Sequence, residues 1–204
     1  MKTGLKLLIV CSVLIMLLGG CSSRPEADTL AVIQAQKGSE YAEMFNALSL
    51  GNIFDYNLSL PHADKTWVEV WVEGYKKGKK MQESPLISLS YGFAPSKTSA
   101  GALGWGIVKE GGAQKSMILY APGVSTGLNS VPDVIDKNLS SMMGSVIGDQ
   151  KLELKAGESA ILAVWRQNES GGYHTYGPEQ LEEMLQTDTV TLVLKIKVDT
   201  KNPK

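Results

Sequence analysis

The sequence predicts a mostly β protein, an Ig-like sandwich of two antiparallel sheets with one or two short helices. About seven short segments alternate apolar and polar residues, with turn residues between them. The 21 glycines are spread along the 204 residues, as in a turn-rich β protein. No strand-like segment alternates regularly with a helical one, which argues against a doubly wound α/β fold. We expect residues 29–204 to form this single domain.

The N-terminus has the charge and hydropathy pattern of a signal peptide. Lys2 and Lys6 precede an apolar run, Leu7–Leu18. At about 12 residues this run is too short for a bilayer span, which takes roughly 20. The small pair Gly-Gly and then Cys21 follow it. Two other interpretations of this N-terminal segment stay open. One is an ordinary signal peptide in which the cysteine is incidental, and the other is a membrane helix that is never cleaved.

The Leu-Gly-Gly-Cys sequence at 18–21, after that charged and apolar lead, resembles the lipobox of bacterial lipoproteins. The resemblance covers residues 1–21 only. It implies cleavage before Cys21 and a diacylglyceryl group on its sulfur, and two acyl chains anchor a protein stably. We therefore expect a signal peptide at 1–20, a lipidated tether at 21–28, and a membrane-anchored protein at the extracytoplasmic face. Ser22 would favour the outer membrane if the organism has one.

Composition limits the possible partners. Cleavage would leave one cysteine, so no intramolecular disulfide can form. It would also remove Lys2 and Lys6 from the 20 basic residues, which leaves 18 against 21 acidic residues. A slightly acidic domain argues against a nucleic-acid partner. The length is sufficient for a hydrophobic core that needs no disulfides.

The first elements after the tether can be assigned from spacing. We expect a helix at about 39–48, because Ser39 can cap it and Gly51 follows its end. Residues 52–60 then alternate as a strand. The clearest strand is 66–75, where valines share one face and the polar and aromatic residues the other. Those faces are Val68, Val70 and Val72 against Trp67, Glu69, Trp71 and Glu73.

Three hairpins, one further strand and a second helix follow. The hairpins turn at Gly78, at Gly111-Gly112 and at Ala156-Gly157. Residues 189–198 alternate as a strand. A helix at about 178–186 has proline at its first position, acids in its first turn and one apolar stripe. That stripe is Leu181, Met184 and Leu185. Residues 125–148 are expected to be loop or loose helix.

Residues 123–127, Gly-Val-Ser-Thr-Gly, match the G-x-S-x-G pattern of a nucleophile elbow. The order Ser125, Asp149, His174 would even suit a triad. However, the elbow needs a helix directly after the serine, and Pro132 follows with no helical stripe. Short Gly/Ser matches are also common in glycine-rich chains. We therefore interpret this stretch as a turn that ends a strand and expect no catalytic residue there.

Metal and cofactor signals are weak. His62 and His174 are the only histidines, whereas a catalytic zinc usually takes three protein ligands with histidine dominant. We expect both in loops, and Glu182 and Glu183 on the exposed side of the short helix. The sequence contains no P-loop, dinucleotide fingerprint, C-x-x-C or EF-hand loop. We expect neither a metal nor a cofactor.

Two groups of residues are candidates for binding. Trp67 and Trp71 fall on one strand face about 13 Å apart, at about 3.3 Å per residue. An exposed face could grip an extended sugar or peptide, with Glu69 and Glu73 as polar partners; the alternative is an inner strand whose rings lie under a loop or the short helix. The second group is a basic hairpin tip, either a solvated turn or a contact with anionic lipid or wall polymer. It consists of Lys76, Lys77, Lys79 and Lys80.

We expect a membrane-anchored, non-enzymatic binding module for an envelope protein or glycan, since loops on a rigid sandwich commonly carry binding sites. Two alternatives remain. One is a cell-envelope hydrolase that uses Ser125 or a carboxylate pair. The other is an assembly subunit that pairs through a strand edge.

Overall fold

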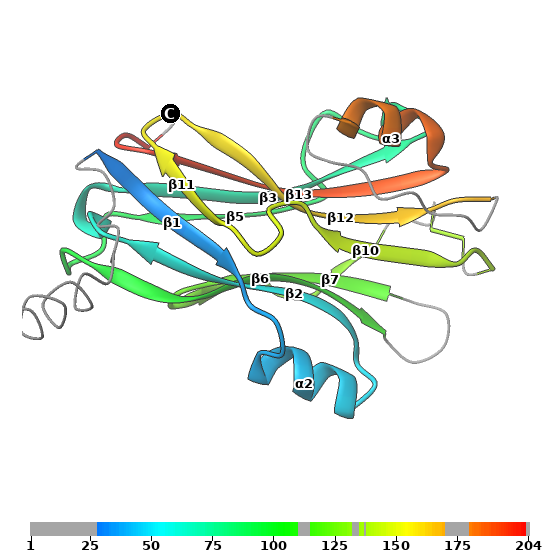
Figure 1. The fold of residues 1–204 in the computed structure, drawn as a ribbon, viewed down its shortest axis with the longest axis horizontal. Helices are drawn as coiled ribbons and strands as arrows, with labels where there is room; N and C mark the ends of the chain where they lie inside the picture. The colour runs from blue at the N-terminus through cyan, green and yellow to red at the C-terminus, as the bar shows by residue number, and fades with distance from the viewer. Residues whose placement is uncertain (1–27, 110–114, 132–134, 137, 170–179, 203–204) are drawn as a thin grey trace, which may run out of the picture.

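The computed structural model describes residues 28–109, 115–131, 135–136, 138–169 and 180–202, which form two antiparallel sheets packed face to face (Figure 1). The first sheet has seven strands in the order β11-β1-β2-β6-β7-β8, and β9 also pairs with β7. The second has six strands in the order β10-β12-β13-β3-β4, and β5 also pairs with β3. The predicted two-sheet sandwich is therefore confirmed.

The strands have the following bounds. Those of the first sheet are β1 (Thr29–Ala35), β2 (Gly51–Leu60), β6 (Ser99–Lys109), β7 (Lys115–Ala121), β8 (Val124–Ser125), β9 (Asn129–Ser130) and β11 (Lys151–Lys155). Those of the second are β3 (Trp67–Lys76), β4 (Lys79–Lys80), β5 (Ile87–Gly92), β10 (Ser141–Ser145), β12 (Ser159–Gln167) and β13 (Val190–Asp199). The helices are α2 (Glu40–Ala47), the 3₁₀ turn η1 (Ala63–Lys65) and α3 (Leu181–Thr187).

The core lies between the sheets and follows the alternation in the sequence. Along β3, the valines predicted to share a face are fully buried. Side chains of β2 pack with them from the opposite sheet, and Tyr56 also links the two sheets directly. Its hydroxyl donates to the carbonyl oxygen of Leu162 in β12, at 2.8 Å. Burial raises the pKa of Tyr56, so this hydroxyl keeps its proton as a donor.

The two helices cover the outer faces of the sheets. Ser39 caps α2 as predicted, its hydroxyl accepting from the Ala42 amide at 3.1 Å. Phe45 of α2 packs over Gly106 of the first sheet. On the second sheet, the predicted apolar stripe of α3 faces inward, and Met184 is buried against Val164 and Val193. Glu182 and Glu183 are exposed as expected; Pro178, predicted to begin this helix, lies outside the described residues.

One predicted hairpin is wrong. β11 pairs with β1 in the first sheet, whereas β12 pairs with β10 and β13 in the second. The turn at Ala156-Gly157 therefore carries the chain from one sheet to the other. Gly157 adopts a positive φ of 82°, and its amide donates to the Val198 carbonyl of β13 at 2.9 Å. A glycine turn between two strands suits both a hairpin and such a crossing, so local chemistry did not distinguish them.

Other segments match or extend the predictions. The turn at Gly78 is a two-residue hairpin in which Lys77 and Gly78 both have positive φ, 47° and 78°, as a type I′ turn requires. β5 also pairs with β3, antiparallel. Residues 29–35 form β1, which the sequence did not assign. In the described part of 125–148, which was expected to be loop or loose helix, two segments are the strands β9 and β10. Within the described residues, no helix combines the length and apolar character needed to cross a membrane.

A candidate binding groove on the second sheet

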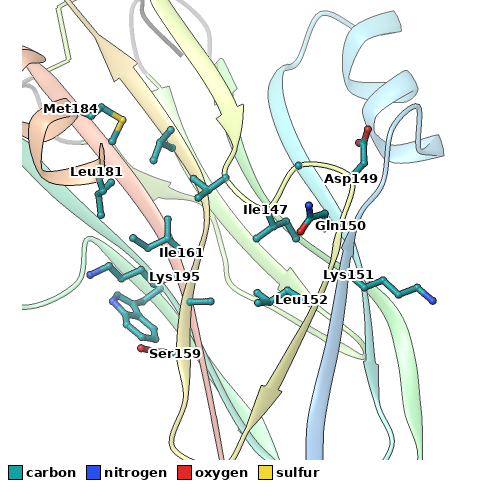
Figure 2. A pocket seen from close by; sticks show the side chains of 15 residues that line it. Ile147, Asp149, Gln150, Lys151, Leu152, Ser159, Ile161, Leu181, Met184 and Lys195 are labelled. Carbon is teal, nitrogen blue, oxygen red and sulfur yellow. The ribbon is translucent and has the colours of Figure 1, made fainter. Parts of the chain in front are cut away.

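A groove of about 840 Å³ lies on the outer side of the second sheet, beside α3 (Figure 2). Ile161 of β12 and Lys195 of β13 lie at its floor. Leu181 and Met184 of α3 form one wall. The opposite wall is the segment 146–152, which leads from β10 in the second sheet to β11 in the first. The groove is thus framed by one helix, two strands and one crossing segment.

A buried ion pair fixes the helical wall. Arg166 of β12 donates to both carboxylate oxygens of Asp188, through Nε and, at 3.0 Å, through Nη2. The side chains are only 4% and 0% exposed. Asp188 is also the C-terminal cap of α3, its amide donating to Met184. A planar guanidinium holds a carboxylate in a fixed orientation, so this pair sets where α3 lies over the sheet.

The opposite wall is held by contacts to both sheets. The Val146 amide donates to the Leu162 carbonyl at 2.8 Å. The side chain of Asp149 forms an exposed ion pair with Lys37, at 2.7 Å. Because its ends belong to two different sheets, the segment 146–152 spans the open side of the sandwich. Its apolar side chains Ile147 and Leu152 point toward the groove (Figure 2).

A charged cluster borders the floor. Glu73 of β3 is 11% exposed and accepts from Lys195 at 2.8 Å and from the Tyr75 hydroxyl at 2.6 Å. It also accepts from the indole Nε1 of Trp71 at 3.1 Å and from Lys80 at 3.4 Å. Trp71 and Lys195 both line the groove. The carboxylate of Glu73 therefore orients an aromatic ring and a cation at the groove floor.

The pKa values in this cluster reflect these contacts. Burial alone would raise the pKa of Glu73, but the hydrogen bonds from Lys195, Tyr75 and Trp71 outweigh it and lower the pKa to about 2. For Tyr75, burial and the adjacent Glu73 carboxylate raise the pKa to about 12. At neutral pH the cluster thus contains a carboxylate and a protonated phenol, and both are held in place.

The two predicted tryptophans differ in their surroundings. Both lie on the half-exposed face of β3 predicted for them, opposite the buried valines. Trp71 reaches the groove, whereas Trp67 packs at 5.7 Å against the ring of Phe93, beyond the groove. Glu69 is half-exposed and opposite Lys197 in the β13 register. The structure brings only Trp71 and Glu73, of the predicted four, to one site.

The predicted basic hairpin tip is exposed and partly paired. Lys76, Lys77, Lys79 and Lys80 are all exposed. Lys80 pairs with Glu73, and Lys77 pairs with Glu169 at 3.3 Å. The amide of Lys77 also donates to Thr189, so the hairpin tip adjoins the end of α3. Two of the four lysines therefore pair with carboxylates of this domain, in addition to any contact with an anionic lipid or polymer.

The other candidate residues are dispersed. Ser125 of β8 pairs with Tyr120 of β7, and the element that follows Ser125 is the strand β9 and not a helix. The elbow geometry is therefore absent, as the sequence argument anticipated. His62 precedes η1 in a loop, and His174 lies outside the described residues, as does Cys21. No group of three His, Cys, Asp or Glu side chains in the described part of the chain could hold a metal.

Sequence reasoning missed most of the groove. From the sequence, Leu181 and Met184 belong only to the apolar stripe of a helix. Ile161 falls in a predicted hairpin, and Lys195 falls in an alternating strand. Their meeting depends on the placement of α3, for which the sequence offered no signal beyond its apolar stripe. Comparisons gave no further guidance: no family model, no curated protein and no solved structure matches this chain.

Proposed function

We propose that the protein is a lipid-anchored, extracytoplasmic binding module whose site is the groove beside α3. The observation that carries this is the groove itself, with an oriented Trp71 and Lys195 at its floor and apolar side chains on both walls. Apolar pockets with a few placed polar groups are the usual form of a ligand site. The lipobox resemblance at Cys21 supports the anchor, and with it an envelope location.

The occupant we propose is a segment of an envelope protein that presents apolar side chains and an acidic group. The apolar part matches Ile161, Leu181 and Met184. The acidic group matches the exposed Lys151 at the groove, and it can share Lys195 on the floor with Glu73. Half-exposed aromatic residues such as Trp71 frequently dominate the binding energy of such interfaces.

Capture from solubilised envelope tests this proposal. The full-length protein would be immobilised and exposed to separate protein and glycan fractions of the envelope. We expect one protein to be retained, and Trp71→Ala to weaken its retention by at least about tenfold, typical of a buried aromatic anchor.

Trp67→Ala is the matched control, because it removes the same ring from the same strand face outside the groove. It should leave capture unchanged. Retention of glycan alone would replace the protein occupant with a sugar. Equal loss of capture in both variants, or full retention in Trp71→Ala, would refute the groove as the site.

The hydrolase alternative has less support. Ser125 does not line the groove and belongs to a two-residue strand of the first sheet. Ser125→Ala should therefore leave capture and any cellular phenotype intact. Loss of the phenotype in a folded Ser125→Ala variant would favour the hydrolase instead.

A further inference from the structure

Several loops meet at the end of the sandwich where the tether joins the domain, which we call the tether end. Thr29 begins β1 opposite Lys155. The pairing of Val32 with Ser59 places Thr29 level with the loop that follows β2. Figure 1 shows the start of β1 and the ends of β2 and β11 on the same side of the molecule.

Hydrogen bonds join the loops of this end. The loop around η1 and the loop that follows β5 exchange backbone hydrogen bonds in both directions. The Ala63 amide donates to Lys97 at 2.8 Å, and the Phe93 amide donates to Thr66 at 3.0 Å. The Ala94 amide donates to the Ala63 carbonyl oxygen at 3.0 Å. The side chains of both loops therefore belong to one continuous surface at the tether end.

An exposed aromatic residue occupies this surface. Phe93 is 44% exposed and has a φ of 52°, in the left-handed region that bulky residues rarely adopt. Its ring packs against half-buried Trp67, with centroids 5.7 Å apart and planes 34° apart. Gly92 pairs with Trp67, and a Cβ at Gly92 would clash with the Thr66 carbonyl oxygen and with Trp67, so the chain before Phe93 packs closely on the start of β3. Strained backbone that exposes an apolar side chain is more typical of functional surfaces than of ordinary loops.

Charge at the tether end complements an anionic surface. Lys65 and Lys97 are exposed on the two joined loops, and among the described residues neither has an ion-pair partner. The acidic side chains at this end are half-buried Asp64 in η1, Asp28, which pairs with Lys155, half-buried Asp199 and exposed Glu158. Basic side chains beside a membrane attract anionic headgroups, and aromatic rings favour the interfacial layer.

The tether restricts which surface can reach a bilayer. Eight residues, 21–28, precede β1, and a chain of that length spans at most about 28 Å at about 3.5 Å per residue. The helix α2 and its C-terminal cap also expose apolar side chains, which are Tyr41, Met44 and Leu48. They follow β1 in the chain, so the length of β1 separates them from the tether. That helix also carries Glu40 and Glu43, which anionic lipid repels.

We propose that the tether end rests on the bilayer, with Phe93 in the headgroup layer and Lys65 and Lys97 on anionic lipids. This inference rests on the lipid anchor of the proposed function. It fixes which side of the domain faces the membrane, and it leaves the groove beside α3, at a distance from the tether end, open to a partner.

Fluorescence quenching by lipid tests the contact. The full-length acylated protein would be placed in vesicles of phosphatidylcholine and phosphatidylglycerol with brominated acyl chains near the headgroups. Trp105 and Trp165 are buried, and Trp71 is in the groove. We therefore expect quenching that Trp67→Phe abolishes and Trp71→Phe preserves. Phe93→Ser combined with Lys65→Glu should reduce it severalfold, whereas Met44→Ser on α2 should not.

The outcomes separate this inference from the anchor. Mass spectrometry of the Cys21 peptide reports acylation independently. An acylated protein without quenching, or with the same quenching in Trp67→Phe, would overturn the contact and leave the anchor intact. Quenching lost in Met44→Ser would assign the contact to α2 instead. An unmodified Cys21 would overturn the anchor, and the proposed contact with it.

Discussion

At the scale of single residues, Glu73 has the most consequential surroundings. Four donors bind its one carboxylate. The alternation of residues along β3 predicted only that Glu73 shares a strand face with the two tryptophans. A carboxylate that accepts several hydrogen bonds and faces a cation stays ionised well below its ordinary pKa. The same contacts fix the Trp71 ring and the Lys195 ammonium group, so one side chain couples local stability to the shape of the groove.

Glu73 should make stability depend on acid pH. Its folded pKa of about 2 lies below the ordinary value of 4.5, so its stabilisation is fully present above about pH 4.5 and is lost as pH falls toward 2. Between pH 7 and pH 3, wild type should lose more unfolding free energy than Glu73→Gln, because only wild type has this carboxylate to protonate. The expected difference is about 1–2 kcal/mol, since solvent screens part of the interaction. Denaturant titration at both pH values measures this difference.

Glu69→Gln is the control for Glu73. This variant neutralises a glutamate on the same face of β3. Among the described residues, no hydrogen bond reaches the side chain of Glu69. We expect its loss of stability on acidification to match that of wild type. An identical pH response in all three proteins would show that the cluster contributes nothing.

At the scale of elements, the strongly alternating strands could be predicted and their partners could not. The valines of β3 and the alternation of β13 follow from one buried face, which any sandwich requires. By contrast, β11 and β12 look like a hairpin, and only pairing with the distant β1 and β13 separates them. The groove has the same origin, because Trp71 was visible in the sequence but the position of α3 depends on Arg166 and Asp188.

Removing the anchor of α3 should be costly. Asp188→Ala removes the Asp188 carboxylate that faces buried Arg166, and loss of one partner of a buried pair costs about 3–5 kcal/mol. Guanidinium titration should show this as a lower midpoint. The double variant Arg166→Met with Asp188→Leu removes both charges and should recover most of the stability. If the single variant is as stable as wild type, the pair does not hold α3.

At the scale of the whole molecule, the tether end and the groove on the second sheet have separate roles in the proposals above. The tether end carries Phe93 and the attachment of β1, and the groove is framed by α3 on the second sheet. The sequence predicts an anchor at Cys21 but could not indicate which loops lie beside the start of β1. That arrangement depends on hydrogen bonds between η1 and the loop after β5, which are remote in sequence and have no local signature.

Anchoring itself is tested by fractionation. Cys21→Ser should move the protein from the membrane to the soluble fraction, because no acyl chain can attach, and the domain should stay folded by circular dichroism. Cys11→Ser is the matched control, since Cys11 lies in the predicted signal peptide. Quantitative membrane retention of Cys21→Ser would show that the lipid is not the sole anchor.

The position of β1 also bears on the order of assembly. Among the strands that the structure describes, β1 is made first, yet its neighbours are β2 and β11, and Thr29 pairs with Lys155. One hydrogen-bonding edge of β1 must therefore wait until more than half of the chain has been made. Pairings this distant in sequence close slowly, because loop entropy is lost before the contacts form. Until Lys155 has been made, the growing chain exposes this edge of β1, so the incompletely synthesised protein is a natural client for a holding chaperone.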